Sequence, residues 1–434
     1  MHKRHGTHVI LGAITPAHDA VDAETLAYPN LRAALKSQNL PAFLRRSGSE
    51  MLRKRLKFRP AAMQEDFAST YLLNAAYRLQ KARTMPEKLF WSTQFTKTSM
   101  KLFGRPLSRE VASIAAEELE YFTNAVEEYG IDQDFAAPVL GAYGSLISKR
   151  AKLHPSLEKR YARVLESMHD FFLNEYRECF TCFEKFAPNA LLTPQDLAEC
   201  FMVALDTMKS RDAAWEGWSV IHNKGAKLSV NVGRKRIIIG NRRSPMTVAE
   251  AKGLLAHEIL VHAQRAVQGG KRSHDLAIGL PDYLVAEEGL GALVESAING
   301  SIPLKIKDRY IDIALALGAW RRRPLLRNEM YVFCYSRAVI RSVVNDDAID
   351  LDELEHVTWE HVNRIYRGSL GNNYLAVFTK DIAYYQGFIK MAKYLQGAVR
   401  RGRLTDSLAY VYSGKFDPTN PAHRKIVADS KPDQ

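Results

Sequence analysis

The sequence lacks any long hydrophobic run and contains few cysteines. No stretch of about 20 apolar residues occurs, so we expect no membrane-spanning helix and no membrane partner. The apolar run Val9–Ile14 near the N-terminus is too short for a secretory signal. Four cysteines in 434 residues are too few for a disulfide scaffold. These absences together predict a soluble protein of the reducing cytoplasm.

Two of the four cysteines, Cys179 and Cys182, form a C-x-x-C motif. Such a motif is typical of a redox pair or of half a zinc site. No second C-x-x-C follows, and the flanking residues have the pattern of an amphipathic helix rather than of a strand-to-helix turn. We therefore interpret the pair as two half-buried thiols.

Acidic residues are in the minority, since 48 Asp and Glu against 61 Lys and Arg give a formal net charge of +13. This surplus attracts anionic partners, among which nucleic acid, anionic lipid and acidic peptides all qualify. Basic residues gather at 45–59 and in Arg321–Arg323, either as an anion-binding patch or as solvated helix faces. No DNA- or RNA-binding motif with its own spacing is present, so nucleic acid is not the expected partner.

Helical periodicity dominates the rest of the chain. From about residue 65 to 210, apolar residues recur at intervals of three and four, and Thr193-Pro194 is typical of a helix start. The pattern predicts a mainly helical N-terminal region over residues 1–210 and a second domain over residues 211–412, which contains the motif described below. Residues 413–434, rich in Pro, Asp, Lys and Ser, are expected to form a flexible tail.

One segment has the period of a β-strand instead. Leu228–Val232 alternates apolar and polar residues, Gly233-Arg234 can turn the chain, and Lys235–Gly240 supplies a partner strand. The predicted fold class is therefore mostly α, with a small β-hairpin or sheet that directly precedes the helix described next.

That helix carries two histidines. Thr247–Glu250 fits a capping box, and Gly269-Gly270 fits a helix stop. Between them, His257, Glu258 and His262 resemble the H-E-x-x-H motif of zinc peptidases, but the histidines are five residues apart instead of four. Five residues of regular α-helix separate two side chains by about 140°, too far for one metal ion. A shared metal therefore requires a wide, π-type turn between the histidines, and the alternative is two unrelated helix histidines.

A second helix with clustered carboxylates is expected after Pro281-Asp282. Metal sites of two histidines and one glutamate leave a fourth position open for water. Glu287, Glu288 and Glu295 are the candidates for that glutamate, and His274 in the intervening loop is a rival ligand.

Several segments resemble a known family. The six residues HEILVH, followed by EEGLG at 287–291, resemble the H-E-x-x-x-H and Q-E-G-L-A motifs of the QEGLA-motif family, whose bacterial members carry an old label of flavohaemoglobin expression modulation. Animal relatives are the microtubule-associated tyrosine carboxypeptidases, which remove the C-terminal tyrosine of α-tubulin. Tyr366-Arg367-Gly368 and the FTKD segment at 378–381, with Tyr384 and Gly387, are also similar, so the resemblance spans about residues 225–390.

The resemblance implies that His257, His262 and Glu288 bind zinc and that Glu258 is the general base. The histidine spacing and the glutamate pair are also similar to those of the dipeptidyl-peptidase III family, which implies a gluzincin-like core. The chain departs from Q-E-G-L-A at two positions, with Glu for Gln at 287 and Gly for Ala at 291. Neither change is at the position of a proposed ligand, although the negative charge that Glu287 adds beside the site bears on substrate preference.

These features predict a zinc-dependent peptidase, and the resemblance implies a carboxypeptidase that releases a C-terminal residue such as Tyr or Phe. Glu258 would take a proton from the attacking water. Tyr366 and Tyr384 are the candidates for donating a hydrogen bond to the developing oxyanion.

An enzyme of this kind must also hold the free carboxylate of its substrate. Arg367 and Lys380 are the candidates, with Arg364 as an alternative, because a guanidinium can bind both oxygens at once. Ordinary salt bridges are the competing interpretation for each of these residues.

The expected partner is therefore a peptide or protein C-terminus of acidic character, given the tubulin substrate of the family and the positive net charge. The competing class is a basic nucleic-acid-binding or regulatory protein without catalysis. Bound zinc would favour the enzyme, whereas salt-sensitive nucleic-acid binding without metal would favour the alternative.

Overall fold

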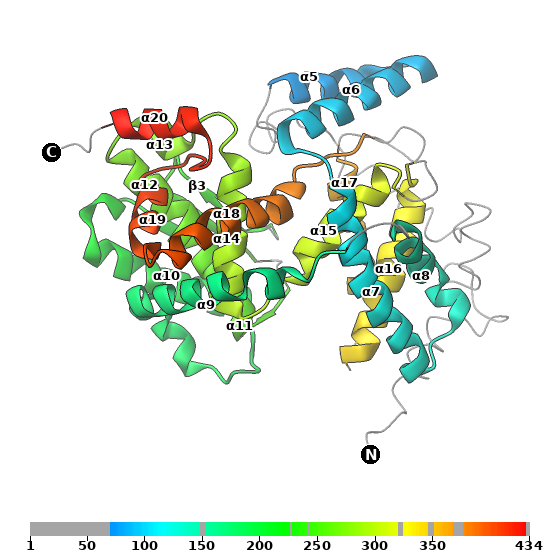
Figure 1. Ribbon diagram of the computed structural model, residues 1–434, viewed down its shortest axis with the longest axis horizontal. Coiled ribbons are helices and arrows are strands. Elements are labelled where there is room, and N and C mark those ends of the chain that lie inside the picture. The colour runs from blue at the N-terminus through cyan, green and yellow to red at the C-terminus, as the bar shows by residue number, and fades with distance from the viewer. Residues whose placement is uncertain are drawn as a thin grey trace. The chain divides into compact units, whose positions relative to one another are not determined.

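The computed structural model describes residues 70–147, 153–225, 228–241, 244–319, 324–345, 351–367 and 376–430. Helices make up most of these segments, with a few short strands, which confirms a mostly α fold with a small sheet (Figure 1). No helix in these segments combines the length and the apolar character needed to cross a bilayer. The basic residues at 45–59 and 321–323 lie outside the described residues.

The chain forms two compact units, each assembled from two separate stretches of sequence. The first unit contains the residues up to Ser156 together with Lys307–Ile382, and the second contains Leu157–Ile306 together with the residues from Ala383 onward. The chain therefore changes unit near residues 156, 306 and 382, whereas we predicted boundaries at 210 and 412. Periodicity identifies a helix but not the helix against which it packs, which is why the sequence did not predict this division.

The described part of the first unit is built of helices around an aromatic core. The rings of Phe122 and Tyr143 stack with 5.7 Å between centroids, and those of Tyr331 and Trp359 stack at 4.3 Å. Its helices are α5 (Thr70–Lys81), α6 (Met85–Phe103), α7 (Ser108–Tyr129), α8 (Gln133–Leu146), α15 (Leu304–Ala316), α16 (Arg327–Asn345) and α17 (Leu351–Ile365).

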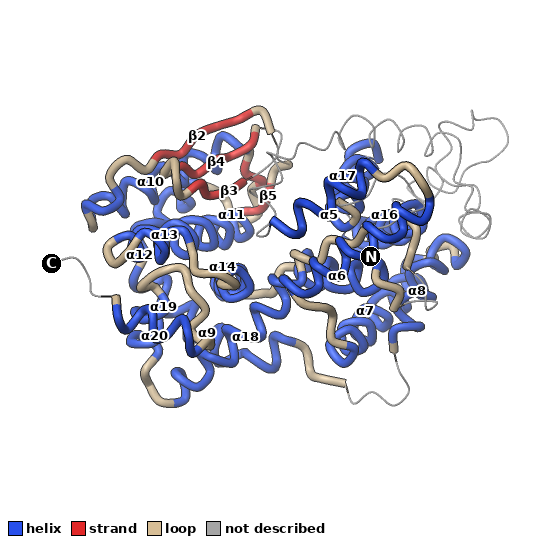
Figure 2. Tube along the Cα trace, turned by 90° about the horizontal axis from the view of Figure 1, so that it is seen from above, coloured by secondary structure: helices blue, strands red, loops and turns tan. Residues whose placement is uncertain are grey.

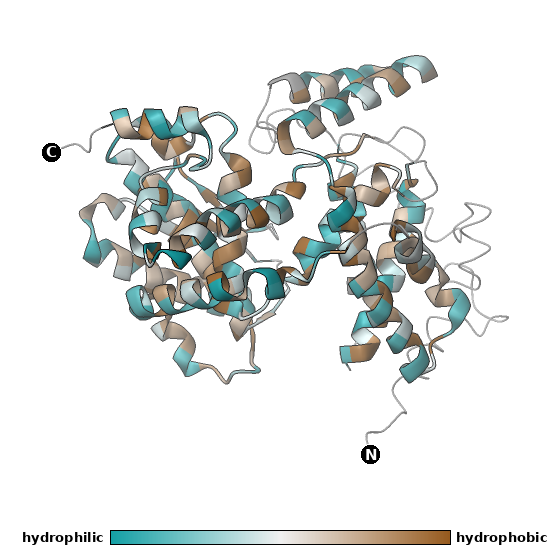
Figure 3. Ribbon diagram, viewed as in Figure 1, coloured by the Kyte–Doolittle hydropathy of each residue, from teal (hydrophilic) through white to brown (hydrophobic). Residues whose placement is uncertain are grey.

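The second unit holds the described strands and the remaining described helices. Most of these helices carry hydrophilic beside hydrophobic residues, as amphipathic elements do (Figure 3). One helix, α14 (Leu284–Asn299), is instead buried on every side from Ala286 to Ile298. The other helical elements are α9 (Leu157–Glu175), η1 (Arg177–Lys185), α10 (Pro194–Arg211), η2 (Ala213–Trp215), α11 (Val248–Leu255), η3 (Ala256–Ala263), α12 (Gln264–Gly270), α13 (His274–Ile278), α18 (Ile382–Arg400), α19 (Leu404–Val411) and α20 (Pro421–Asp429).

A three-stranded sheet in the second unit has the order β2-β4-β3 (Figure 2). The strands β3 (Leu228–Asn231) and β4 (Arg236–Gly240) pair antiparallel, which confirms the predicted hairpin. A further strand, β2 (Ser219–Asn223), pairs parallel with β4 on its other side and was not predicted. A separate pair, β1 (Leu191–Leu192) and β5 (Met246–Thr247), lies directly before the histidine helix.

The predicted helix starts are confirmed at Thr193 and Thr247, both of which form capping boxes. At the second, the hydroxyl of Thr247 accepts a hydrogen bond from the Glu250 amide at 3.2 Å, and the Glu250 carboxylate accepts one from the Thr247 amide at 2.9 Å. These bonds satisfy amides that the first helical turn would otherwise leave without acceptors. They fix the start of the helix ten residues before its first histidine.

Residues 413–430, which we expected to belong to a flexible tail, instead pack into the second unit. Lys415, Phe416 and Asp417 are buried, and α20 follows them. The Lys415 amide donates to the Leu276 carbonyl at 2.7 Å, and the Lys415 carbonyl accepts from the Leu280 amide at 3.0 Å. The partners lie more than a hundred residues away in sequence, so local composition carried no sign of this packing.

Candidate metal centre

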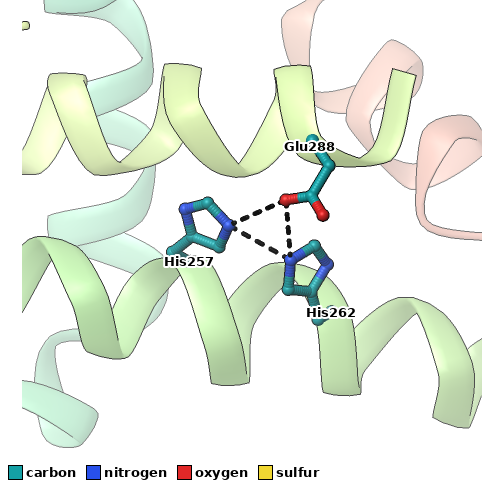
Figure 4. A group of neighbouring side chains, drawn as sticks. All are labelled: His257, His262 and Glu288. Atoms are coloured by element: carbon teal, nitrogen blue, oxygen red, sulfur yellow. Dashed lines mark hydrogen bonds and ion pairs between the residues drawn. The ribbon is translucent and has the colours of Figure 1, made fainter. Parts of the chain in front are cut away.

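The two histidines lie on a π-helical segment, η3, between the α-helices α11 and α12. This segment confirms the predicted wide turn. A π-helix places about one more residue in each turn than an α-helix, because its hydrogen bonds join residues five apart. Side chains five residues apart therefore point the same way, and His257 and His262 face one side of the helix (Figure 4).

Three donor atoms converge between η3 and the buried helix α14, which pack against each other. The Nε2 atoms of His257 and His262 are 3.1 Å apart. Glu288 Oε2 lies 3.7 Å from the first and 3.6 Å from the second (Figure 4). The side chains are only 6%, 13% and 10% exposed, so the site lies in a largely desolvated part of the unit.

The dimensions of this triangle suit a metal ion. Ligand atoms at about 2.0–2.1 Å from a tetrahedral zinc ion lie about 3.4 Å from each other. The three observed separations, 3.1, 3.6 and 3.7 Å, lie on both sides of that value. Two imidazole nitrogens and one carboxylate oxygen are also the donor types that zinc prefers in sites with an open fourth position.

Two further carboxylates orient the histidine rings by bonding Nδ1, on the side of each ring that faces away from the three donor atoms. Glu295 Oε2 lies 3.0 Å from Nδ1 of His257, and Glu287 Oε1 lies 2.9 Å from Nδ1 of His262. Because each Nδ1–H is used in these bonds, the lone pairs of both Nε2 atoms point to the centre of the triangle. Sequence reasoning treated Glu287 and Glu295 as rival ligands, and the structure places them on the far side of the rings. His274, the other rival, lies exposed at the start of α13.

Glu287 also connects the site to two buried cations. Its carboxylate forms an ion pair with the Arg265 guanidinium, which is fully buried, and lies 3.1 Å from Nζ of Lys415. Arg265 in turn donates to the carbonyls of Val411 at 3.1 Å and Phe416 at 2.7 Å. These cations outweigh the effect of burial and hold the pKa of Glu287 far below its usual value. Glu287 therefore lies beside the site, as the sequence indicated, and its carboxylate bonds the ring of His262, a proposed ligand.

Gly291, the other departure from the family motif, also contacts a proposed ligand. A Cβ atom at this position would lie 2.6 Å from Nε2 of His257, closer than non-bonded atoms approach. The absence of a side chain at 291 thus makes room for the imidazole.

A second close approach brings another helix to the site. A Cβ atom on Gly289 would lie 2.1 Å from the carbonyl carbon of Gly387, so the backbones of α14 and α18 touch at this point. Tyr384 lies one turn before Gly387 on α18, and its ring centroid is 6.4 Å from that of His257. The close approach of these two glycines holds α18 against α14, and Tyr384 is a residue of α18.

The electrostatics of the cluster favour a bound cation. Burial lowers the pKa of His257, but its interactions with Glu288 and Glu295 and the charge of Glu258 outweigh that effect and raise its pKa to about 10. The pKa of His262 is raised by its neighbouring carboxylates in the same way. Two Nε2 atoms at 3.1 Å cannot both carry a proton directed at each other, so the carboxylates favour one cation between the rings.

Glu258, the predicted general base, lies on η3 next to the first histidine and is 9% exposed. Its proximity to His257 is evident from the contribution of its charge to the pKa of that ring. Glu258 is thus the residue next to one of the three donors in the sequence and is not itself one of them.

The remaining predicted site residues belong to the first unit. Tyr366 is fully buried, and its hydroxyl donates to the Leu325 carbonyl at 2.8 Å. Arg364 binds both carboxylate oxygens of Asp381, at 2.5 and 2.8 Å, which is the structural salt bridge that we considered as its alternative. The guanidinium of Arg367 lies 5.6 Å from the ring centroid of Phe378. Of the two predicted tyrosines, Tyr384 has its ring near that of His257, whereas the Tyr366 hydroxyl already donates to a backbone carbonyl.

The described residues contain a second group of potential metal ligands, Asp312, Cys334 and His361. Here Arg337 donates to both oxygens of Asp312, at 2.8 and 2.7 Å, and His361 Nε2 lies 2.5 Å from one of them. Because an arginine already occupies the carboxylate, this group is a buried ion-pair network rather than a metal site.

The fold and the cluster define a mostly helical protein with a buried donor set of two histidines and one glutamate. Residues 349–422 match the model of a family described as microtubule-associated tyrosine carboxypeptidase. The match supports the relation to this family that the motifs indicated, over a segment that contains Arg367, Lys380 and Tyr384 but none of the three metal donors. The chain has no match among curated proteins.

Proposed function

We propose that this protein is a zinc-dependent peptidase of the carboxypeptidase type with a gluzincin-like core, in which His257, His262 and Glu288 bind the metal. The observation that carries the proposal is the donor triangle itself. Its three atoms have the spacing and chemistry of a zinc site, and both histidines are held by carboxylates with their free nitrogens inward.

A zinc ion bound by these residues would polarise the substrate carbonyl and lower the pKa of water. Glu258 then acts as the general base, taking a proton from the attacking water and passing it to the departing amine. Tyr384 is the candidate for a hydrogen bond to the developing oxyanion, since its ring lies beside that of His257.

The sheet offers a place for the peptide backbone. β3 is an edge strand of the three-stranded sheet and packs against η3, the segment that bears the histidines. An extended peptide can pair with such an edge through main-chain hydrogen bonds, independent of its side chains. Binding there would present a peptide bond near the metal donors.

The substrate we propose is the C-terminus of a peptide or protein, with Tyr or Phe as the released residue, in the cytoplasm. Support comes from the matched family, whose description names a tyrosine carboxypeptidase. Arg367 and Lys380 lie in the matched segment and are the residues we propose to bind the terminal carboxylate.

The metal assignment is tested by elemental analysis of the purified protein. We expect about one zinc ion per chain, lost in a His257→Ala/His262→Ala double variant whose helical circular dichroism is retained. Full zinc occupancy in the double variant would show that the metal binds elsewhere.

The role of Glu258 is tested by its replacement with Gln. The variant should keep zinc but lose activity by about 10²-fold or more, because an amide cannot accept the proton of the attacking water. The measurement is turnover of a set of peptides with varied C-terminal residues, followed by mass spectrometry. Turnover close to that of the wild type would remove Glu258 from the mechanism.

A further inference from the structure

The C-x-x-C motif lies on η1, a 3₁₀-helix that packs against α10. Residues three apart in a 3₁₀-helix lie directly above one another. Cys179, Cys182 and Lys185 therefore form one line along the face of η1 that meets α10. The spacing of the motif thus directs both thiols at the neighbouring helix instead of at each other.

The partner of each residue in this line is a different position of α10. Cys179 is fully buried, with its Sγ atom 3.7 Å from the sulfur of Met208. Cys182 is half-buried, and its Sγ atom lies only 3.0 Å from Sγ of Cys200. Lys185 forms an ion pair with Glu199 at 2.9 Å, beside the two sulfurs. The close thiol pair of this protein is therefore Cys182 with Cys200, not the pair that the motif indicates.

We propose that Cys182 and Cys200 form a site of oxidative modification, at which a hydroperoxide converts the two thiols to an intramolecular disulfide. A disulfide bond is about 2.05 Å long, so the sulfurs need to approach by only about 1 Å. Cys182 is the first to react, because its side chain is partly exposed whereas that of Cys200 is fully buried.

The chemistry balances with hydrogen peroxide as the oxidant. The Cys182 thiolate attacks one peroxide oxygen and breaks the O–O bond, giving a sulfenic acid and hydroxide, which takes a proton to become water. The Cys200 sulfur then attacks the Cys182 sulfur and displaces its hydroxyl group, which leaves as a second water with the Cys200 proton. Burial raises the pKa of the Cys179 thiol to about 11, which keeps that residue protonated and unreactive.

The disulfide bond would cross-link the segment that contains β1, which pairs with the strand directly before the histidine helix. Between the two cysteines lies β1, whose Leu191 pairs with Thr247 in β5. Thr247 is also the N-cap of α11, the helix that continues into η3. Cross-linking across an 18-residue separation restricts the unfolded chain and so stabilises the folded unit around β1.

The test is peptide mapping of the full chain after treatment with hydrogen peroxide, without reducing agent. Trypsin should release Glu178–Lys185 and Phe186–Lys209 as one cross-linked species, two hydrogen atoms lighter than the separate peptides, and reduction should part them. The cross-link should persist in Cys179→Ser and disappear in Cys182→Ser and in Cys200→Ser. The melting temperature should rise by about 5 °C or more on oxidation in wild type and Cys179→Ser, but not in Cys182→Ser or Cys200→Ser.

Several results would overturn the proposal. The first is a cross-link that forms only when Cys179 is present. The second is oxidation of Cys182 to sulfinic acid without any cross-link. The third is that the thiols stay reduced at peroxide concentrations that oxidise free cysteine. A cross-link that leaves the melting temperature unchanged would overturn the inference that the bond stabilises the segment around β1. Cys334→Ser is the matched control, since this cysteine lies in the first unit and its loss should change none of these results.

Discussion

Three glutamates on α14 surround the two histidines, and each meets a ring at a different atom. Glu288 faces the Nε2 side, whereas Glu287 and Glu295 face the two Nδ1 atoms. The sequence narrowed the third donor to these residues, because they lie on one helix at a suitable distance from His262. Choosing among them from the residues alone was not possible, since the rotation of α14 against η3 is set by tertiary packing, such as the close contact of Gly291 with the His257 ring.

Glu287 should stabilise the folded protein through its ion pairs with two buried cations, Arg265 and Lys415. Glu287→Gln removes the charge that compensates Arg265 and Lys415, so we expect the free energy of unfolding to fall by about 3 kcal/mol at pH 7. The measurement is urea unfolding in excess zinc. Glu178→Gln is the control, because Glu178 is exposed and its loss should cost less than about 0.5 kcal/mol.

The sign of the pH dependence follows from the depressed pKa of Glu287. A carboxylate whose pKa is lower in the folded than in the unfolded protein stabilises the fold above the unfolded value of about 4.3. That stabilisation is lost as the pH falls further, so the difference between wild type and Glu287→Gln should shrink below about pH 4. Equal stability of the two proteins at pH 7 would contradict the ion-pair argument.

Gly291 should control the position of His257. In Gly291→Ala the new methyl group would displace the imidazole, and we expect zinc affinity to fall by about 10- to 100-fold, as when a residue that orients a ligand is changed. A competition titration with a zinc chelator measures this. Gly141→Ala is the matched control on α8, where the added Cβ meets nothing within 4 Å and affinity should stay unchanged. Unchanged zinc affinity in both variants would mean that the His257 ring can shift to accommodate the methyl group without weakening metal binding.

At the scale of elements, local signals were sufficient for the segments that carry the site. The capping box at Thr247, the alternation in β3 with the turn that follows it, and the five-residue histidine spacing each predicted a feature that the structure contains. The strand β2 was missed although it is as long as β4, because its partner does not follow it directly in the sequence. The strands β1 and β5 were missed because each has only two residues. A two-residue strand has no period to detect.

The π-helical turn should be removable by deleting one residue. Without Leu260 the histidines would be four apart, which a regular α-helix places on one face, and the flanking helices would keep their orientation. The shortened protein should therefore fold and bind zinc. Deletion of Lys252 in α11 is the control, since it rotates both histidines by about 100° relative to the helix start and should abolish binding. Loss of zinc in both deletions would mean that the wide turn itself is needed to place the ligands.

At the scale of the whole molecule, the sequence predicted the fold class but not how the chain divides. Each unit contains two stretches of chain that are separated in the sequence by a stretch of the other unit. The three proposed metal donors all come from the first stretch of the second unit, whereas residues of its second stretch, such as Tyr384, lie beside them. Lys415 shows this most directly, because it comes from the expected tail and pairs with Glu287 beside the site. Contacts between residues so far apart in the sequence produce no periodic pattern from which they could be predicted.

Substrate polarity gives the last prediction, which concerns the whole chain. If the enzyme anchors a terminal carboxylate, a peptide with a free C-terminus should be cleaved at least about 10-fold faster than its amidated form at low concentration, since a charged hydrogen bond contributes about 1.5–3 kcal/mol. Arg367→Ala and Lys380→Ala should raise KM for the free peptide with little change in kcat and should leave the amidated peptide unaffected.

The net charge of +13 adds a salt dependence to the same experiment. Attraction of an acidic peptide falls off over about 10 Å at 0.1 M salt, so kcat/KM for a peptide with acidic residues before the scissile bond should fall as salt rises. A peptide with neutral residues at those positions is the control and should respond weakly. Equal cleavage of free and amidated peptides would exclude carboxylate anchoring and point to an endopeptidase or aminopeptidase on the same metal centre. Rates that do not respond to salt for either peptide would mean that the basic surplus serves something other than substrate capture.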